Sequence, residues 1–383
     1  MKQHEGSESQ LSTYMEESRS LVTAEIERLF GPNEERTSGL YELILDYPLR
    51  EGKALRPTLA IATCRALGGY LEAVLPTSAT LELYHNAFLI HDDIEDDSLM
   101  RRGRPTLHLE HGVPIAVNVG DAMLVLSLEP LLENIEVVGL GPALKILEAV
   151  ARMSRHSVEG QAIELEWVRE NRWDLSDDDY RRMVVEKTGW YSFITPTQIG
   201  AIVAGATPQQ VAQLEEFATE LSVAFQITDD LLNLHADVER YGKEIGGDLW
   251  EGKRTVMLLH AIRTASAQDA ERARSILAKP RPTGVRRDPR LDETLDELLK
   301  AGDLTSGGQA AIDSLRTTAK TSDDVEWLLD LLIRQQSAVY AARMARKHAE
   351  LADIALRSLD WIPRNRHRDI LEDLIAFVHE RTR

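Results

Sequence analysis

Apolar residues recur along the chain with the period of an α-helix. In the segment 211–228, one face is formed at spacings of three or four by Val211, Leu214, Phe217, Ala218, Leu221, Phe225 and Thr228. Thr207-Pro208-Gln209-Gln210 marks the start of this helix with a cap, a proline in the first turn and a capping-box glutamine. Ser176, followed by three aspartates, marks another start. Because the sequence has no sustained alternating run of the strand type, the pattern predicts an all-α fold.

The sequence contains no linker that would divide the chain into separate domains. Its 383 residues include only 23 Gly and 14 Pro, which favours long helices with few turns. We expect residues 1–10 to be a disordered tail and residues 11–383 to form a single helical domain. A polar loop rich in Pro and Arg should interrupt this domain at residues 279–289, and a last helix should run from about residue 368 to residue 383.

Charge and cysteine content restrict the function classes. The 63 acidic and 44 basic residues give a net charge of −19, which disfavours binding to nucleic-acid phosphates. The one cysteine, Cys64, lies in an apolar run, so we expect a small core residue rather than a disulfide or a zinc ligand. No uninterrupted apolar segment reaches the roughly 18 residues of a membrane span. The acidic N-terminus resembles neither a signal nor a transit peptide, so the sequence predicts a soluble, cytoplasmic protein without a transmembrane segment.

The first candidate site is an acidic motif within an apolar helix. His85, Leu89, Asp92 and Asp96 fall on one narrow stripe of the helix face. Because Asp92 and Asp96 are one turn apart, both carboxylates can bind the same ion or pair of ions. Asp93 lies to one side, where it can orient the ligands. Oxygen-only ligands favour Mg²⁺, which also binds substrate phosphates.

A second acidic motif follows in a strongly apolar helix. Gln226, Asp229 and Asn233 share one face, and Asp230 flanks it. Each motif alone could be a solvated acidic patch, which is our interpretation of the run 177–179 at a helix start. Two such motifs inside apolar helices, each followed by basic residues, favour metal binding instead.

Basic residues accompany both acidic motifs and could hold anionic substrates. They are Lys53 and Arg56 before a helix that Pro57 can open, Arg101 and Arg102 after the first motif, Lys187 beside Thr188, and Lys243 and Lys253 around a Gly-rich turn after the second motif. Taken singly, each has an ordinary alternative, such as a surface pair, charge balance for nearby acids, or an exposed turn.

Together these segments resemble the trans-isoprenyl diphosphate synthases, the family of farnesyl and geranylgeranyl diphosphate synthases. The resemblance extends in order and spacing from about residue 50 to residue 255. Its matching features are Gly52-Lys53…Arg56-Pro57, His91-Asp92-Asp93-Ile94-Glu95-Asp96 with Arg101-Arg102-Gly103, Gly120-Asp121, Gly160-Gln161, Lys187-Thr188, Phe225-Gln226…Asp229-Asp230, and Gly242-Lys243…Asp248…Gly252-Lys253. It implies a single bundle of long helices around a central cavity and a homodimer that condenses isoprenyl diphosphates head to tail.

The resemblance also implies a role for each matching residue. Asp92 and Asp96 would bind two Mg²⁺ ions and Asp229 a third, with support from Asp93 and Asp230. The allylic diphosphate would be held by Arg101, Lys187 and Lys243, and isopentenyl diphosphate by Lys53, Arg56, His85 and Arg102. Gln226 and the backbone of Lys187 and Thr188 would face the carbocation. Apart from the resemblance, the Gly-rich loop with Lys243 and Lys253 could close over phosphates or could be an exposed turn.

Product length should depend on the residues beneath Asp92. A bulky Phe88 would narrow the tunnel, a small Ala87 would widen it, and Tyr84 lies further round the helix. One aromatic and one small residue predict geranylgeranyl diphosphate, with farnesyl diphosphate as the nearest rival. The alternative is that Phe88 simply packs in the core.

Three other functions compete with this interpretation. A class I terpene cyclase would need no grip for a second diphosphate, and a non-catalytic synthase subunit would generally have lost acidic ligands. A helical scaffold would leave the clustered charge unexplained. One departure from many relatives is Asn233, a neutral residue where they have Asp.

Overall fold

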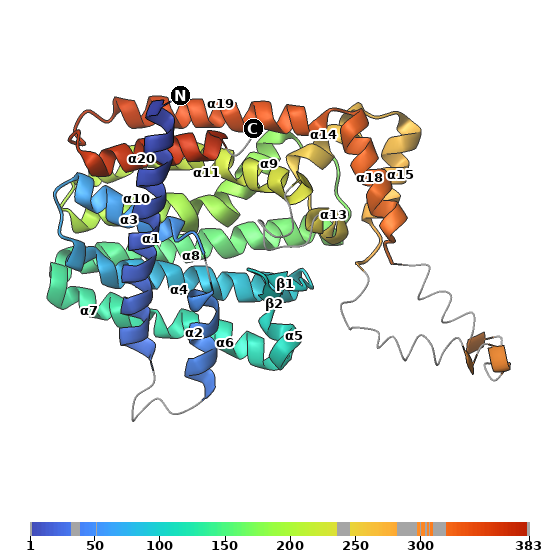
Figure 1. The fold of residues 1–383 in the computed structure, drawn as a ribbon, viewed down its shortest axis with the longest axis horizontal. Helices are drawn as coiled ribbons and strands as arrows, with labels where there is room; N and C mark the ends of the chain where they lie inside the picture. Colours follow the sequence, from blue (N-terminus) through green and yellow to red (C-terminus); the bar gives the residue numbers. More distant parts are fainter. Residues whose placement is uncertain are drawn as a thin grey trace.

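Long helices make up nearly all of the described chain, so the predicted all-α fold is confirmed (Figure 1). The structure is a computed structural model and describes residues 2–31, 39–50, 52–235, 246–281 and 319–380, with a few positions between 297 and 308. Most of the polar loop expected at residues 279–289 lies outside these ranges.

The elements follow one another along the chain with short connections. They are α1 (Lys2–Phe30), α2 (Gly39–Leu49), α3 (Leu55–Ala66), α4 (Leu71–Glu95), β1 (Met100–Arg101), β2 (Arg104–Pro105), α5 (Leu107–His111), α6 (Val113–Leu126), α7 (Leu128–Val138), α8 (Leu140–Arg169), α9 (Asp177–Val184), the π-helix η1 (Val185–Ile194), α10 (Thr195–Val203), α11 (Pro208–His235), α13 (Gly247–Glu251), α14 (Val256–Thr264), α15 (Ala267–Leu277), α18 (Ser322–Arg334), α19 (Ser337–Ser358) and α20 (Arg366–Glu380).

The two ends of the chain differ slightly from expectation. Helix α1 begins at Lys2, so the segment 2–10, expected to be a disordered tail, is helical in the structure. Helix α1 then crosses α3 and α4 (Figure 1). The last helix, α20, begins at Arg366 and packs on α3 and α19. The division of the chain into a tail and a single domain stays a prediction.

Two groups of buried apolar side chains stabilise the bundle. The larger one surrounds α3, α4 and α10 and includes Cys64, which is fully buried as expected. The smaller one joins α9, α14, α15 and α18 to the C-terminal half of α11. Because α11 passes from the first group to the second, its acidic motif is fixed between two packed cores.

A two-residue turn separates β1 from β2 and sets the direction of two arginines. Arg101 pairs with Arg104, and the turn residues Arg102 and Gly103 have φ values of 53° and 74°. Positive φ at both turn positions matches the twist of a tight hairpin, and glycine takes it without strain. The hairpin therefore presents Arg101 and Arg102 side by side at the end of α4.

The surface of α6, α7 and the first half of α8 is unusually apolar. By length and composition alone, the described stretch Val113–Val138 could cross a membrane, as core helices of soluble proteins also can. In the structure this stretch divides at Ser127 into α6 and α7, and both helices pack against α4. Its exposed large apolar residues, with those of early α8, are Val113, Ile115, Val117, Val125, Leu128, Leu132, Ile135, Val137, Leu140, Leu144 and Leu147.

Gly160 allows α8 and η1 to approach each other closely. A Cβ atom at this position would lie 2.2 Å from the backbone nitrogen of Lys187 and 2.6 Å from the carbonyl carbon of Glu186. Both atoms belong to the η1 backbone, so they cannot move aside by a simple rotation of a side chain.

We therefore expect Gly160→Ala to lower the free energy of unfolding by about 1–3 kcal/mol, because the added methyl group forces η1 away from α8. Thermal unfolding followed by circular dichroism measures the change. Gly141→Ala is the matched control, since this glycine lies on the same helix with nothing within 4 Å of the added atom. Equal stability of the two variants would contradict the packing argument.

Candidate active site

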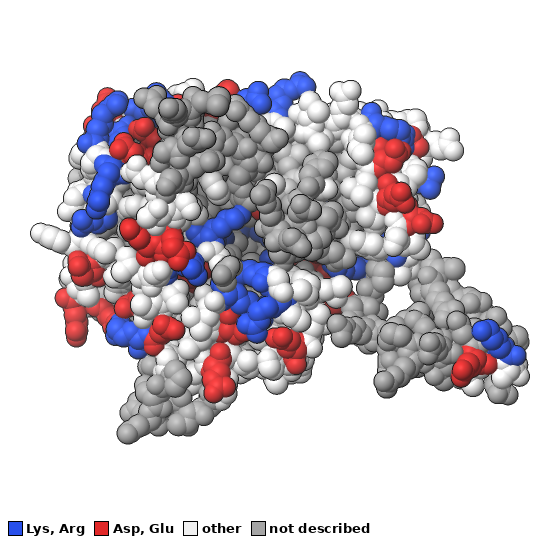
Figure 2. Space-filling view, in the orientation of Figure 1, with Lys and Arg blue, Asp and Glu red and all other residues white. Residues whose placement is uncertain are grey.

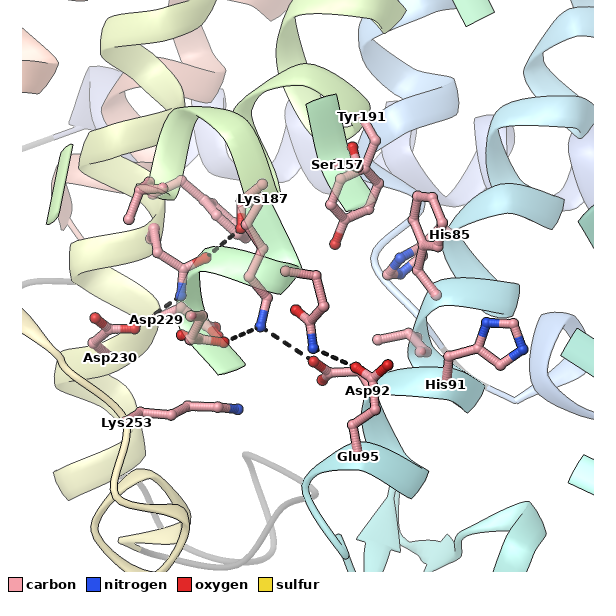
Figure 3. A pocket seen from close by; sticks show the side chains of 18 of the residues that line it. His85, His91, Asp92, Glu95, Ser157, Lys187, Tyr191, Asp229, Asp230 and Lys253 are labelled. Carbon is pink, nitrogen blue, oxygen red and sulfur yellow. Dashed lines mark hydrogen bonds and ion pairs between the residues drawn. The ribbon is translucent and has the colours of Figure 1, made fainter. Parts of the chain in front are cut away.

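A cavity of about 890 Å³ opens between α4, α8, η1 and α11. Basic side chains gather near the middle of the face in Figure 2. In the close view of Figure 3, Asp92 and Asp229 approach the cavity from opposite sides, and Lys187 and Lys253 reach between them. The two acidic motifs, far apart in the sequence, therefore border one space.

The carboxylates of the first motif are in contact with lysines from other elements. Lys187 Nζ on η1 lies 3.2 Å from Asp92 Oδ1 and also contacts Glu164 of α8. Lys253 Nζ, just beyond α13, lies 2.5 Å from Asp96 Oδ2. Asp92 lines the large cavity, and both aspartates line a small adjoining pocket. The lysines thus balance acids that lie one turn apart and would otherwise repel each other.

Asp93 points away from the cavity and organises its wall. Its carboxylate accepts hydrogen bonds from Tyr47 Oη at 2.7 Å and from Arg101 Nε at 2.9 Å. Tyr47 Oη also accepts the N–H of Leu107 at 3.2 Å. The Asp93 side chain is only 1% exposed, and the Arg101 guanidinium also lies 3.7 Å from Asp92. Asp93 therefore holds Arg101, and Arg101 is the residue that borders the cavity.

A chain of hydrogen bonds fixes the second motif. Thr188 Oγ1 donates to Gln226 Oε1 at 3.0 Å, and Gln226 Nε2 donates to Asp230 Oδ1 at 2.8 Å. Tyr180 Oη donates to the other oxygen of Asp230 at 2.7 Å. Both carboxylate oxygens of Asp230 thus accept hydrogen bonds from other side chains of the protein. Its neighbour Asp229 is more exposed and also lines the cavity.

Asn233 has a structural contact at the described end of α11. Its Oδ1 accepts the backbone N–H of Asp248 at 3.2 Å, and its carbonyl oxygen accepts the N–H of Gly246 at 2.8 Å. The side chain is 4% exposed and borders the small pocket. A neutral amide oxygen can accept this hydrogen bond, so Asn233 ties the end of α11 to the start of α13.

Burial and neighbouring charge shift the acids and lysines in opposite ways. Burial raises the pKa of Asp96 to about 8, with Lys253 opposing the shift and Asp92 adding to it. Burial also raises the pKa of Asp230 to about 6, although its two hydrogen bonds oppose the shift. For Lys187, burial disfavours the charged form, but attraction to the acids outweighs it and raises the pKa. Lys187 is therefore held in its charged form, whereas burial makes the charged forms of Asp96 and Asp230 less favourable.

A second group of basic residues lines the same cavity. It consists of Lys53, Arg56, His85 and Arg102. Arg56 Nη2 donates to Ser192 Oγ at 2.6 Å, and its guanidinium lies 4.5 Å from the centre of the Tyr191 ring. Burial lowers the pKa of Arg102, and repulsion by nearby arginines adds to this effect. An anion bound here would relieve that repulsion.

The three residues expected to set product length occupy different positions. Phe88 lines the cavity, where its ring meets that of Tyr191 edge-on at 5.4 Å between centroids. Tyr84 packs edge-on behind Phe88 at 5.9 Å and is not part of the cavity wall. Ala87 is fully buried in the core and does not line the cavity, and its effect on the tunnel stays a prediction.

Comparison with known proteins agrees with this geometry. The family model described as polyprenyl synthetase matches residues 38–288. The chain belongs to the polyprenyl synthetase family. It is accordingly a prenyltransferase of the isoprenyl diphosphate synthase kind.

Relatives of this polyprenyl synthetase differ in the products for which they are named. A short chain isoprenyl diphosphate synthase of Methanothermobacter thermautotrophicus is 38% identical over 229 residues, which are 59% of this chain and 68% of the relative. An octaprenyl diphosphate synthase of Escherichia coli is 34% identical over 226 residues, 59% of this chain and 67% of the relative. A polyprenyl synthase of Caulobacter crescentus, solved with calcium and isoprenyl diphosphate, has a TM-score of 0.77 and 26% identity and covers 97% of each chain.

Most predicted site residues of this polyprenyl synthetase meet around the cavity. Lys243 lies outside the described residues. Reasoning from sequence missed Glu164, Tyr191 and Glu251, which contact Lys187, Phe88 and Lys253 respectively. A helical spacing of three from Gln161 could have revealed Glu164, since Gln161 belongs to a matching feature and donates to Glu95 at 2.5 Å. Tyr191 follows Lys187 by about one helical turn, so its spacing from a matching residue could have revealed it in the same way.

Proposed function

We propose that this polyprenyl synthetase condenses isopentenyl diphosphate head to tail with an allylic diphosphate, using Mg²⁺, and that its main product is geranylgeranyl diphosphate. The observation that carries the proposal is the pairing of two acidic motifs with a separate basic group around one cavity. A condensing enzyme must hold two diphosphates at once, and the chain offers cations on both sides of this space.

The donor set fits a hard divalent cation. Asp92, Asp96 and Asp229 offer carboxylate oxygens at the cavity and its adjoining pocket, without sulfur or imidazole among them. We assign these residues as the ligands of Mg²⁺, with three ions for each active site. The Caulobacter crescentus relative, solved with calcium, supports a cation that prefers oxygen. When bound, Mg²⁺ would neutralise the allylic diphosphate and so make it a better leaving group.

The chain's own residues hold the substrates and protect the reaction. Arg101 and Lys187, with Lys243, hold the allylic diphosphate, and the Lys253 loop closes over it. The allylic carbon–oxygen bond breaks, and the double bond of isopentenyl diphosphate forms the new carbon–carbon bond. A proton then leaves to the departed diphosphate. Thr188 and Gln226 face the carbocation with oxygen atoms, and the apolar walls exclude water that would quench it.

The basic group of Lys53, Arg56, His85 and Arg102 argues against a terpene cyclase. A cyclase handles one diphosphate and gains nothing from a second crowded set of cations. Both acidic pairs are present, which argues against a non-catalytic subunit.

The decisive experiment is incubation of the protein with isopentenyl diphosphate, Mg²⁺ and each allylic starter in turn, with products sized by mass spectrometry. We expect condensation with at least one starter and geranylgeranyl diphosphate as the main product. The absence of condensation with every starter would defeat the proposal.

Asp92→Asn tests the role of the first motif. We expect turnover to fall by at least about 100-fold, because one charged metal ligand is lost, while circular dichroism keeps its helical signal. Asp174→Asn is the control, since Asp174 is 81% exposed and pairs only with Arg172 in the described chain. Wild-type turnover in Asp92→Asn would remove the argument for Mg²⁺ at this position.

Phe88→Ala tests the assignment of product length. Removal of the ring between Tyr84 and Tyr191 deepens the cavity, so we expect products longer by at least one isoprene unit. Tyr84→Phe keeps the ring behind Phe88 and should leave the products unchanged. If mass spectrometry gives the same distribution for Phe88→Ala and the wild type, Phe88 is only a core residue.

We further propose that the protein is a soluble, cytoplasmic homodimer that pairs through α6, α7 and early α8. The support is the row of exposed apolar residues on these helices, a face too apolar to remain in water. A second copy offers the same face, and self-complementary faces suit a two-fold dimer.

Leu132→Glu should therefore shift the protein from twice the mass of one chain to the mass of one chain in analytical ultracentrifugation without detergent. Leu132 is 62% exposed on α7. The control Ile333→Glu changes a residue that is 70% exposed on α18 and should leave the dimer intact. A wild-type protein that sediments as a single chain would contradict the dimer.

A further inference from the structure

The described segment that ends at Arg281 and the one that begins at residue 319 lie next to each other beside the active site. After α15, the carbonyl oxygen of Pro280 accepts the backbone N–H of Lys320 at 2.9 Å. Lys279 Nζ lies 2.7 Å from Asp324 Oδ2, and this ion pair joins the same two segments a second time. The segments around Pro280 and Lys320 are therefore fixed to each other, and both lie next to α13.

Arg281, at the end of the first of these segments, starts a row of alternating charges that reaches the first acidic motif. Arg281 Nη1 lies 3.2 Å from Glu251 Oε1, and Lys253 Nζ lies 2.8 Å from Glu251 Oε2. Lys253 Nζ then lies 2.5 Å from Asp96 Oδ2. The four side chains are between 9% and 18% exposed, so water screens their interactions only weakly.

Lys320, on the second of these segments, contacts the short helix α13. Its Nζ donates to the carbonyl oxygen of Trp250 at 2.7 Å. A Cβ atom added to Gly252 would lie 3.2 Å from this nitrogen, and Gly252 has a φ of 74°. The turn that directs Lys253 towards Asp96 is thus held by Lys320 through the backbone and by Arg281 through Glu251.

We propose that Arg281 is a positioning residue that keeps Lys253 directed at the metal-binding end of α4. Glu251 has two carboxylate oxygens, and each faces one cation. Without Arg281, Glu251 would attract Lys253 more strongly and draw it away from Asp96. Lys253 would then be misplaced for the allylic diphosphate, while the basic group that holds isopentenyl diphosphate would be unaffected. This inference rests on the proposed function of the site.

The test compares Arg281→Ala, Arg281→Lys, Glu251→Gln and the double variant Glu251→Gln/Arg281→Ala in steady-state condensation assays. We expect Arg281→Ala to raise the KM for the allylic diphosphate by about five- to tenfold. The KM for isopentenyl diphosphate should stay at the wild-type value. Arg281→Lys keeps a cation beside Glu251 and should recover most of the loss.

The double variant shows whether Arg281 acts through Glu251. Equal KM values for the double variant and Glu251→Gln support the proposal, because the effect of Arg281 then needs the carboxylate. Additive losses would overturn it, since they would mean that Arg281 contacts the substrate directly from the small pocket. Wild-type constants in Arg281→Ala would overturn it as well.

Two controls separate this inference from others. Arg274→Ala removes an arginine of α15 that pairs with Glu271 at 3.4 Å and should leave all constants unchanged. Circular dichroism of each variant detects unfolding. If Arg281→Ala acted only by unfolding the protein, Arg281→Lys would not be expected to restore the KM for the allylic diphosphate. A wild-type protein without condensation would refute the proposed function itself, whereas an active wild type with an unaffected Arg281→Ala refutes only the role of Arg281.

Discussion

The central constraint in this protein is that several carboxylates must lie close together within a partly buried site. Asp92 and Asp96 are one turn apart, and Asp229 faces them across the cavity. Such a group is stable only if cations from elsewhere in the fold approach it. Lys187 comes from η1 and Lys253 from the turn after α13, so ion pairs with the acids join elements that are far apart in the sequence. The same lysines then stand where an anionic substrate would bind.

This need for charge balance explains why the supporting contacts are so tightly packed. Lys187 reaches Asp92 because η1 lies directly against α8, and Gly160 permits that approach. Arg101 keeps its direction because Asp93 holds it, and Tyr47 holds Asp93 in turn. Lys187 and Arg101 are therefore each fixed in position by packed neighbours, which is the arrangement that catalysis by positioned charge requires.

The sequence predicted the features that depend on local periodicity and missed those that depend on distant contacts. Helical spacing alone placed Asp92 and Asp96 on one face, and the confirmed all-α fold follows from the same period. It could not show that Ala87, next to Phe88, turns into the core, because one residue moves a side chain by about 100° and the neighbouring helix decides which direction is buried. Nor could it reveal Arg281 beside Glu251, since tertiary packing brings together two residues that are 30 positions apart in the sequence.

The raised pKa of Asp96 bears on whether a bound cation would replace Lys253 beside this carboxylate. Burial raises that pKa to about 8 even though Lys253 lies in contact with the carboxylate. The contact with Lys253 therefore does not fully offset the cost of burying this carboxylate, and a cation of higher charge would stabilise its charged form further. Lys253 would then be released towards the diphosphate that such a cation binds. Because Glu251 and Arg281 hold the turn on which Lys253 lies, its movement between the acid and the substrate would be small and directed, rather than a search by a free side chain.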